Sequence, residues 1–162
     1  MIYRTFYALL ISVLITSVAL AQSSHQLNLP TPITFKTGSD RLTTESEKAL
    51  DFIKKYLEEK PSVSLIRIES HVESNKSAKD AQTLTEKRSL AVAQALIKKG
   101  VDCKKIVAVG FGSSKPISDN NTPEGKLKNN RLVVFNAALK GKAIGGLPID
   151  GGGKPSLDLC QK

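Results

Sequence analysis

The stretch IRIESHVE at residues 66–73 is followed by a polar segment at residues 74–82 and by TLTEKRSLAVAQAL at residues 83–96. From Ile66 onward every second residue is apolar or small, and charged or imidazole side chains stand between them. That period of two predicts a strand with only one covered face. Residues 83–96 have a period of three and four, which predicts a helix. The predicted inward stripe is Leu84, Arg88, Ala91, Val92, Ala95 and Leu96.

The predicted helix carries one cation on the stripe that should face the core. Thr83 and Glu86 have the spacing of a capping box at the helix start, and Arg88 follows within the stripe. A buried cation needs a carboxylate or an anionic ligand, and Glu73 at the end of the predicted strand is the natural candidate to face it. Two interpretations remain open. The pair is either a structural ion pair, or a site that binds a zwitterion with Glu73 at its ammonium and Arg88 at its carboxylate.

The N-terminus has the features of a secretory signal peptide. A short start containing Arg4 precedes an apolar run at residues 8–20, and Ala19-Leu20-Ala21 offers a small-x-small cleavage site. The run is too short to span a membrane comfortably. We therefore expect residues 1–21 to be removed on export, and residues 22–32 to form an extended, proline-containing N-terminal segment.

About 140 residues then remain, enough for one domain with its own core. The order of elements, β-α-β-α-β-(α)-β, predicts an α/β fold: a two-layer sandwich with a mixed sheet of about four strands and helices on one face. We expect this domain to span residues 33–139, and the glycine-rich residues 140–162 to form a flexible C-terminal tail. The other predicted elements are a strand at residues 33–36, a helix from a capping box at residues 44–47 to Pro61, a strand at residues 106–110, a short helix from Pro123 and a strand at residues 132–137.

The chain has two cysteines, Cys103 and Cys160. In an exported chain they predict one disulfide that pins the C-terminal tail to the domain. The disulfide would close a loop of about 58 residues, which the chain-entropy model values near 4 kcal/mol. Two Cys and two His, widely separated, match no metal-ligand spacing, so no metal site and no cofactor are expected.

The formal net charge of +9 favours polyanionic partners. The lysines are scattered, few aromatic residues lie among them, and no nucleic-acid-binding motif is present, so nucleic acid is not an expected partner. His71, Glu73 and Asp80 are the only candidate acid–base cluster, and no nucleophile elbow, phosphate loop or metal-ligand pattern accompanies them. We therefore expect a protein that is not an enzyme, in which His71 is a structural, hydrogen-bonding residue.

Several short motifs occur in an order and at spacings that resemble a known family. They are ITF at residues 33–35 with Gly38-Ser39, IESHVE at residues 68–73, LTEKR at residues 84–88, GFG at residues 110–112 and NNR at residues 129–131. Together they resemble the OmpA-like C-terminal domain, the peptidoglycan-associated module of bacterial envelope proteins. The resemblance extends over residues 33–138 and implies the same α/β fold.

The resemblance implies non-covalent binding of the diaminopimelate side chain of peptidoglycan. Glu73 stands where the family has a ligand-binding Asp, and Arg88 stands at the family's ligand-binding Arg. The pair chosen from the residues alone and the pair implied by the family therefore coincide. The further ligand-binding residues expected on this basis are Arg131, Asn129, Thr37 and Gly38.

Several positions depart from the family's pattern, among them Asp80, which stands in place of a Tyr. Lys36 replaces an Asp, and a cation near the ligand's ammonium could cost on the order of a few kcal/mol when partly desolvated. Ala81 replaces an Asn, which removes one or two hydrogen bonds of about 1 kcal/mol each. Glu73 has one methylene more than Asp, and Asn130 stands in place of an arginine. The site is thus weakened, retuned for another envelope ligand, or filled from within by a pair between Lys36 and Glu73.

The expected function is that of an exported, non-catalytic protein that binds peptidoglycan of the diaminopimelate type. The expected location is the periplasm or the outer-membrane-associated cell envelope of a Gram-negative bacterium. The alternative is a structural or protein-interaction domain on the same fold, with a degenerate peptidoglycan site and with envelope proteins as its partners. The sequence leaves the oligomeric state open.

Overall fold

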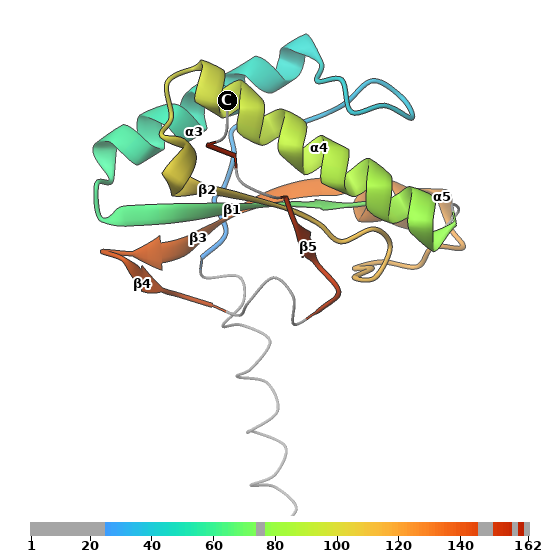
Figure 1. The fold of residues 1–162 in the computed structure, drawn as a ribbon. Helices are drawn as coiled ribbons and strands as arrows, with labels where there is room; N and C mark the ends of the chain where they lie inside the picture. Colours follow the sequence, from blue (N-terminus) through green and yellow to red (C-terminus); the bar gives the residue numbers. More distant parts are fainter. Residues whose placement is uncertain (1–24, 74–76, 146–150, 157–158, 161–162) are drawn as a thin grey trace, which may run out of the picture.

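The computed structural model describes residues 25–73, 77–145, 151–156 and 159–160. Within them, five strands form one mixed sheet, and helices cover one of its faces (Figure 1). The predicted two-layer α/β architecture is therefore confirmed. The elements in chain order are η1 (Thr44–Ser46), α3 (Glu47–Glu59), β1 (Val63–His71), α4 (Ala78–Lys98), η2 (Cys103–Lys105), β2 (Ile106–Gly110), α5 (Pro123–Asn129), β3 (Arg131–Leu139), β4 (Lys142–Ala143) and β5 (Lys154–Pro155).

Strand β1 lies at the centre of the sheet, whose strand order is β4-β3-β1-β2-β5. It runs parallel to β2, with Ile66 opposite Ile106, and antiparallel to β3, with His71 opposite Arg131. A parallel pair needs a long crossover connection, which α4 supplies. The end of β1 and the start of β3 therefore lie side by side at one end of the sheet.

The helical layer is fixed to the sheet by a close approach of α4 to β2. A Cβ atom on Gly110 would lie 2.5 Å from the main-chain nitrogen of Glu86 and 2.8 Å from Oγ1 of Thr85, so only glycine fits there. The N–H of Gly112 donates a hydrogen bond of 2.8 Å to the same Thr85 hydroxyl. Both layers contribute to the core, where the fully buried aliphatic side chains include Leu50, Ile53, Ile66, Ile68, Val92 and Leu96.

Helix α4 begins earlier than predicted and buries a different face. Ser77 is its N-cap: the hydroxyl accepts from the N–H of Asp80 at 3.1 Å and donates to the Asp80 carboxylate at 2.7 Å. The capping box predicted for Thr83 and Glu86 is therefore wrong. Arg88 is half-buried rather than central to the stripe. The buried residues of α4 are Ala81, Thr85, Ser89, Val92, Ala93 and Leu96.

The strand predicted at residues 33–36 is replaced by irregular chain with a single bridge between Phe35 and Leu42. The segment just before it runs along β3 instead, where the N–H of Leu27 donates to the carbonyl of Val134 at 2.8 Å. Leu27 is buried and belongs to the hydrophobic core. The N-terminal segment thus packs on the sheet without forming a regular strand.

The capping box predicted at residues 44–47 is also wrong. Neither Thr43 before η1 nor Ser46 before α3 accepts a capping hydrogen bond with its side chain. The buried hydroxyl of Ser46 instead accepts from the N–H of Thr34 and donates to its carbonyl, both at 3.0 Å. Ser46 therefore connects the chain before η1, at Thr34, to the start of α3.

The described parts of the C-terminal segment differ from the flexible tail that its glycines predict, because they contain two short strands. β4 pairs with the end of β3, and β5 pairs with β2 at the opposite edge of the sheet, so this one segment supplies both edge strands. The predicted Cys103–Cys160 disulfide is present, with Cα atoms 5.3 Å apart. Next to it in the sequence, Leu159 packs against the hydrophobic core.

Among the described residues, no helix has the length and apolar character needed to span a membrane. The same part of the chain has no group of three or more His, Cys, Asp or Glu side chains arranged to hold a metal ion. The predicted signal peptide at residues 1–21 lies outside the described residues.

Loss of the disulfide should lower the free energy of unfolding. The two cysteines are 57 positions apart, and the chain-entropy model predicts a loss of about 4 kcal/mol in the double variant Cys103→Ser, Cys160→Ser. Urea denaturation of the oxidised protein, the reduced protein and the variant measures this loss. A reductant should lower the midpoint of the wild type to that of the variant and leave the variant unchanged. Equal midpoints for oxidised wild type and variant would contradict the prediction.

Candidate ligand-binding site

A pocket of about 370 Å³ lies where β1 ends and β3 begins. Its walls come from the chain before η1, the end of β1, one face of α4, and α5 with the first residues of β3. Three charged residues, Glu73, Arg88 and Arg131, line it among mostly apolar side chains. The apolar lining residues are Ile33, Phe35, Val72, Leu84, Leu127 and Leu132.

Arg88 is held in the pocket by two contacts with the chain before η1. Its Nε donates to the carbonyl of Ser39 at 2.9 Å, and its guanidinium carbon lies 4.9 Å from the centre of the Phe35 ring, a cation–π distance. Burial lowers the pKa of Arg88 and the charge of Asp40 opposes that shift, but an arginine remains cationic in either case. Within the described residues its two terminal nitrogens make no other hydrogen bond, so they are free to bind a carboxylate.

Glu73 enters the same pocket from the end of β1. Its N–H donates to Oδ1 of Asn130 at 3.3 Å, which ties the end of β1 to the start of β3. Its carboxylate forms no ion pair with Arg88, with Lys36 or with any other cation among the described residues. The interpretation as a structural ion pair is therefore wrong, and so is the idea that Lys36 fills the site from within.

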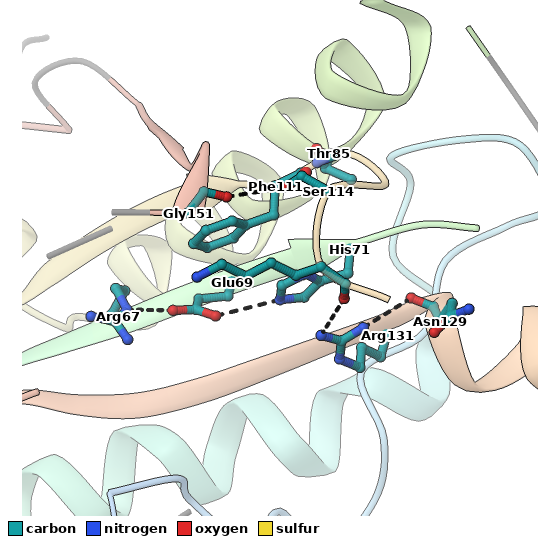
Figure 2. A network of polar contacts seen from close by, with 11 residues as sticks. Arg67, Glu69, His71, Thr85, Phe111, Ser114, Asn129, Arg131 and Gly151 are labelled. Atoms are coloured by element: carbon teal, nitrogen blue, oxygen red, sulfur yellow. Dashed lines mark hydrogen bonds and ion pairs between the residues drawn. The ribbon is translucent and has the colours of Figure 1, made fainter. Parts of the chain in front are cut away.

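Thr37, Gly38 and Arg131, which were also expected at the ligand, line the pocket. Thr37 and Gly38 form one rim, and the φ of +66° at Gly38 is a backbone conformation that favours glycine. The Arg131 guanidinium donates to the carbonyl of Lys115 at 3.1 Å and to that of Asn129 at 3.5 Å (Figure 2). These two bonds connect Arg131 to the loop after β2 and to the end of α5, and its binding of a ligand stays a prediction.

Asn129 lies outside the pocket lining and is fully buried. Its Oδ1 accepts from the N–H groups of Ile117 and Ser118, and its Nδ2 donates to the carbonyl of Ser118 and to the side chain of Asn120. With its amide fully used, Asn129 fastens the loop before α5 rather than facing the pocket. The adjacent Asn130, which sequence reasoning did not select, lines the pocket instead.

Two of the departures from the family's pattern do not reach the pocket. Lys36 is exposed and Ala81 is fully buried in α4, and neither is a lining residue. Any repulsion between Lys36 and a bound ammonium therefore acts through solvent, where it is screened. Sequence reasoning also missed Phe35 and Ser39 as the residues that hold Arg88, although both lie in motifs that it had matched to the family.

The model of the OmpA family matches residues 34–131. The chain belongs to the OmpA family. The matched span contains Glu73, Arg88 and all of the pocket except Ile33 and Leu132. The family's characteristic region and the candidate site are thus the same part of the molecule.

Two curated proteins illustrate the relationship. The probable lipoprotein YiaD of Escherichia coli (strain K12) is 31% identical over 121 residues, which is 74% of this chain and 55% of that protein. The sodium-type flagellar protein MotY of Vibrio parahaemolyticus is 30% identical over 100 residues, 62% of this chain and 34% of that protein. The chain therefore spans between about a third and about a half of the length of these relatives.

Solved structures share the fold. The peptidoglycan-associated lipoprotein from Burkholderia pseudomallei matches with a TM-score of 0.59 at 23% identity, over 64% of this chain and 86% of that one. The C-terminal domain of Helicobacter pylori MotB matches with a TM-score of 0.58 at 25% identity, over 65% of this chain and 82% of that one. Both likenesses confirm the fold of this OmpA-family domain.

On the sheet face away from the helices, this OmpA-family domain carries a row of polar side chains from β1 (Figure 2). Nε of Arg67 donates to one carboxylate oxygen of Glu69, and Nε2 of His71 lies 3.4 Å from the other. Neither ring nitrogen of His71 has a hydrogen-bond partner in the described structure. His71 thus meets Glu69 at 3.4 Å without the geometry of a well-formed hydrogen bond.

His71 is covered by a stack of side chains that ends at the C-terminal segment. The Phe111 ring lies nearly parallel to the imidazole, with centroids 5.0 Å apart, and Nζ of Lys115 lies 4.4 Å from the centre of the Phe111 ring. The Ser114 hydroxyl lies within hydrogen-bonding distance, 3.2 Å, of the Gly151 carbonyl, which places the C-terminal segment beside this stack (Figure 2). Only 2% of His71 is exposed as a result.

Burial lowers the pKa of His71, and the positive charges of Arg131 and Lys115 act in the same direction, while the contact with Glu69 opposes them. For Glu69, burial alone would raise the pKa of the carboxyl, but the contact with His71 and the charge of Arg67 outweigh it, so this pKa is lowered. At neutral pH the pair is therefore a neutral imidazole beside an ionised carboxylate.

Acidification should destabilise the protein through His71. The pKa of His71 is lower in the folded protein than the usual 6.5, so the unfolded protein takes up a proton first as the pH falls. The neutral imidazole therefore contributes fully to the free energy of unfolding above pH 6.5. This contribution is lost as the pH falls from 6.5 toward the pKa in the folded state. Between about pH 7 and pH 5, wild type should lose about 1 kcal/mol more unfolding free energy than His71→Gln. Urea denaturation at a series of pH values measures both slopes. Equal slopes above pH 5 would show that His71 does not titrate on unfolding.

Proposed function

We propose that this protein is a non-catalytic peptidoglycan-binding protein of the cell envelope. The observation that carries the proposal is one pocket lined by Glu73 and Arg88, which are not paired with each other. A carboxylate and a guanidinium held apart suit a zwitterion. The ammonium of the ligand binds Glu73, and its carboxylate binds the two terminal nitrogens of Arg88.

The apolar walls fit the rest of such a ligand. Val72 and Leu84 lie on the same pocket as the two charged residues, so a short aliphatic chain can pass between them toward the charged groups. The side chain of diaminopimelate in a peptidoglycan stem peptide has this chemistry, because it is a methylene chain that ends in an ammonium and a carboxylate. The contacts of Arg88 with Ser39 and Phe35 orient the guanidinium in advance, which lowers the entropic cost of binding.

The relatives and the disulfide support an envelope location. One structural neighbour is named a peptidoglycan-associated lipoprotein, and one curated relative is named a probable lipoprotein. The Cys103–Cys160 disulfide is suited to an oxidising compartment. We place the protein in the periplasm or at the outer membrane of a Gram-negative bacterium, exported by the signal at residues 1–21, with Thr37 and Gly38 at the rim of its ligand site.

Arg88→Ala should weaken ligand binding strongly. Because truncating one partner of a charge-assisted pair costs about 2–5 kcal/mol, the affinity for meso-diaminopimelate should fall about 30-fold or more in calorimetric titration. Lys87→Ala is the matched control, since Lys87 is the neighbouring cation on α4, is exposed and lies outside the pocket. Glu73→Gln, which keeps the shape of the side chain, should also weaken binding.

A thermal melt of each variant shows whether it is folded, so that a loss of binding is not mistaken for a loss of structure. Binding by Arg88→Ala equal to that of wild type would refute the assigned site. Wild type that binds neither meso-diaminopimelate nor sedimented peptidoglycan would refute the proposed function and favour a protein-interaction domain with a degenerate site.

Lys36→Asp should change the affinity by less than about threefold, because Lys36 is exposed and outside the pocket lining, where its charge is screened. The same calorimetric titration at physiological ionic strength measures the effect. A gain of tenfold or more would show that Lys36 opposes the ligand directly and that the loop carrying it closes over the pocket.

A further inference from the structure

Leu127 differs from the other apolar residues of the pocket in its exposure. Some 74% of Leu127 is exposed, whereas Ile33 and Val72 are buried and Phe35 and Leu84 are half-buried. A lining residue with that much exposed surface lies at the mouth of the pocket rather than on its floor. It is also the lining residue that has the most apolar area left to remove from water when a ligand binds.

Helix α5 presents Leu127 from a rigid position. The hydroxyl of Thr122 caps the helix by accepting from the N–H of Gly125 at 3.0 Å. A Cβ on Gly125 would overlap the carbonyl oxygen of Asp119, so the helix packs on the preceding loop without a gap. At its other end the buried amide of Asn129 bonds that same loop. Burying a side chain on so firmly held a helix costs little conformational entropy.

The stem peptide and the free amino acid differ in what they can place against Leu127. An exposed apolar side chain at the mouth of a pocket suits a ligand that has a small apolar group where it leaves the pocket. At its second centre the free diamino acid has an ammonium and a carboxylate, and no apolar group follows. In the peptide an amide replaces that ammonium, and the chain continues to D-Glu and to the methyl group of L-Ala.

We propose that Leu127 makes the pocket prefer the diamino acid within a stem peptide over the free amino acid. This rests on the proposed function. Glu73 and Arg88 bind the zwitterionic end that the peptide and the free amino acid share. The part of the peptide that projects from the mouth lies against Leu127 and excludes water from it.

Leu127→Ser tests this assignment with two probes, free meso-diaminopimelate and the tripeptide L-Ala-D-Glu-meso-diaminopimelate. In calorimetric titrations of the full chain, the variant should bind the tripeptide about five- to tenfold more weakly and the free amino acid within about twofold of wild type. The heat-capacity change on binding the tripeptide should also become less negative, because less apolar surface is buried. Because Leu127 is exposed, the variant should keep the melting temperature of the wild type, which its melting curve checks.

Ile117→Ser is the matched control. Ile117 is 64% exposed, precedes α5 in the loop that Asn129 holds, and does not line the pocket, so both affinities should stay at the wild-type value. Arg88→Ala should lose both probes alike, which separates the shared site from the mouth.

Three results would overturn the assignment while leaving the proposed function in place. They are wild-type tripeptide affinity in Leu127→Ser, an equal loss for both probes, and an equal loss in Ile117→Ser. Wild type that binds neither probe would instead refute the proposed function, and the role of Leu127 with it.

Discussion

The pocket depends on the contact between α4 and β2 at Gly110. Because no side chain separates them there, the backbone of Glu86 lies directly over the strand, and Thr85 accepts a hydrogen bond from Gly112. Arg88 follows one turn later on the same helix, so its height above the sheet is set by this contact. The end of β1, which carries Glu73, is fixed by the parallel pairing with β2. The contact at Gly110 thus sets the position of Arg88, and the pairing of β1 with β2 sets that of Glu73.

That close approach also explains why the sequence predicts α4 well but its buried face poorly. Thr85 and Ser89 are fully buried. Their hydroxyls donate to the carbonyls of Gln82 and Glu86 within the helix, at 2.9 and 3.0 Å, which offsets the cost of removing them from water. A pattern of apolar residues cannot reveal a face made of small, internally satisfied polar side chains. The alternation in β1, by contrast, follows directly from the period of a strand, and it predicted that element correctly.

The position of Glu73 and Arg88 at one pocket was predictable because both residues stand in motifs and have opposite charges, while the contacts that hold Arg88 were not. Arg88 is held by the main-chain carbonyl of Ser39 and by the Phe35 ring. A contact with a main-chain carbonyl cannot be predicted from a sequence, because every residue has that group. The exchange of roles between Asn129 and Asn130 has the same origin, since only the turn at the end of α5 decides which amide is buried. In the C-terminal segment the glycines indicate flexibility, whereas in its described parts two short strands pair with the sheet and Cys160 forms a disulfide.

Since the C-terminal segment supplies β4 at one edge and β5 at the other, it decides what the outside of the sheet offers to another molecule (Figure 1). Lys142 stands in one outer strand and Pro155 in the other. A lysine opposes the approach of another strand, and a proline has no N–H to extend a ladder. Both outer edges of the sheet are therefore closed to pairing with a strand of a second molecule, and loss of β4 or of β5 would expose β3 or β2 as a new edge.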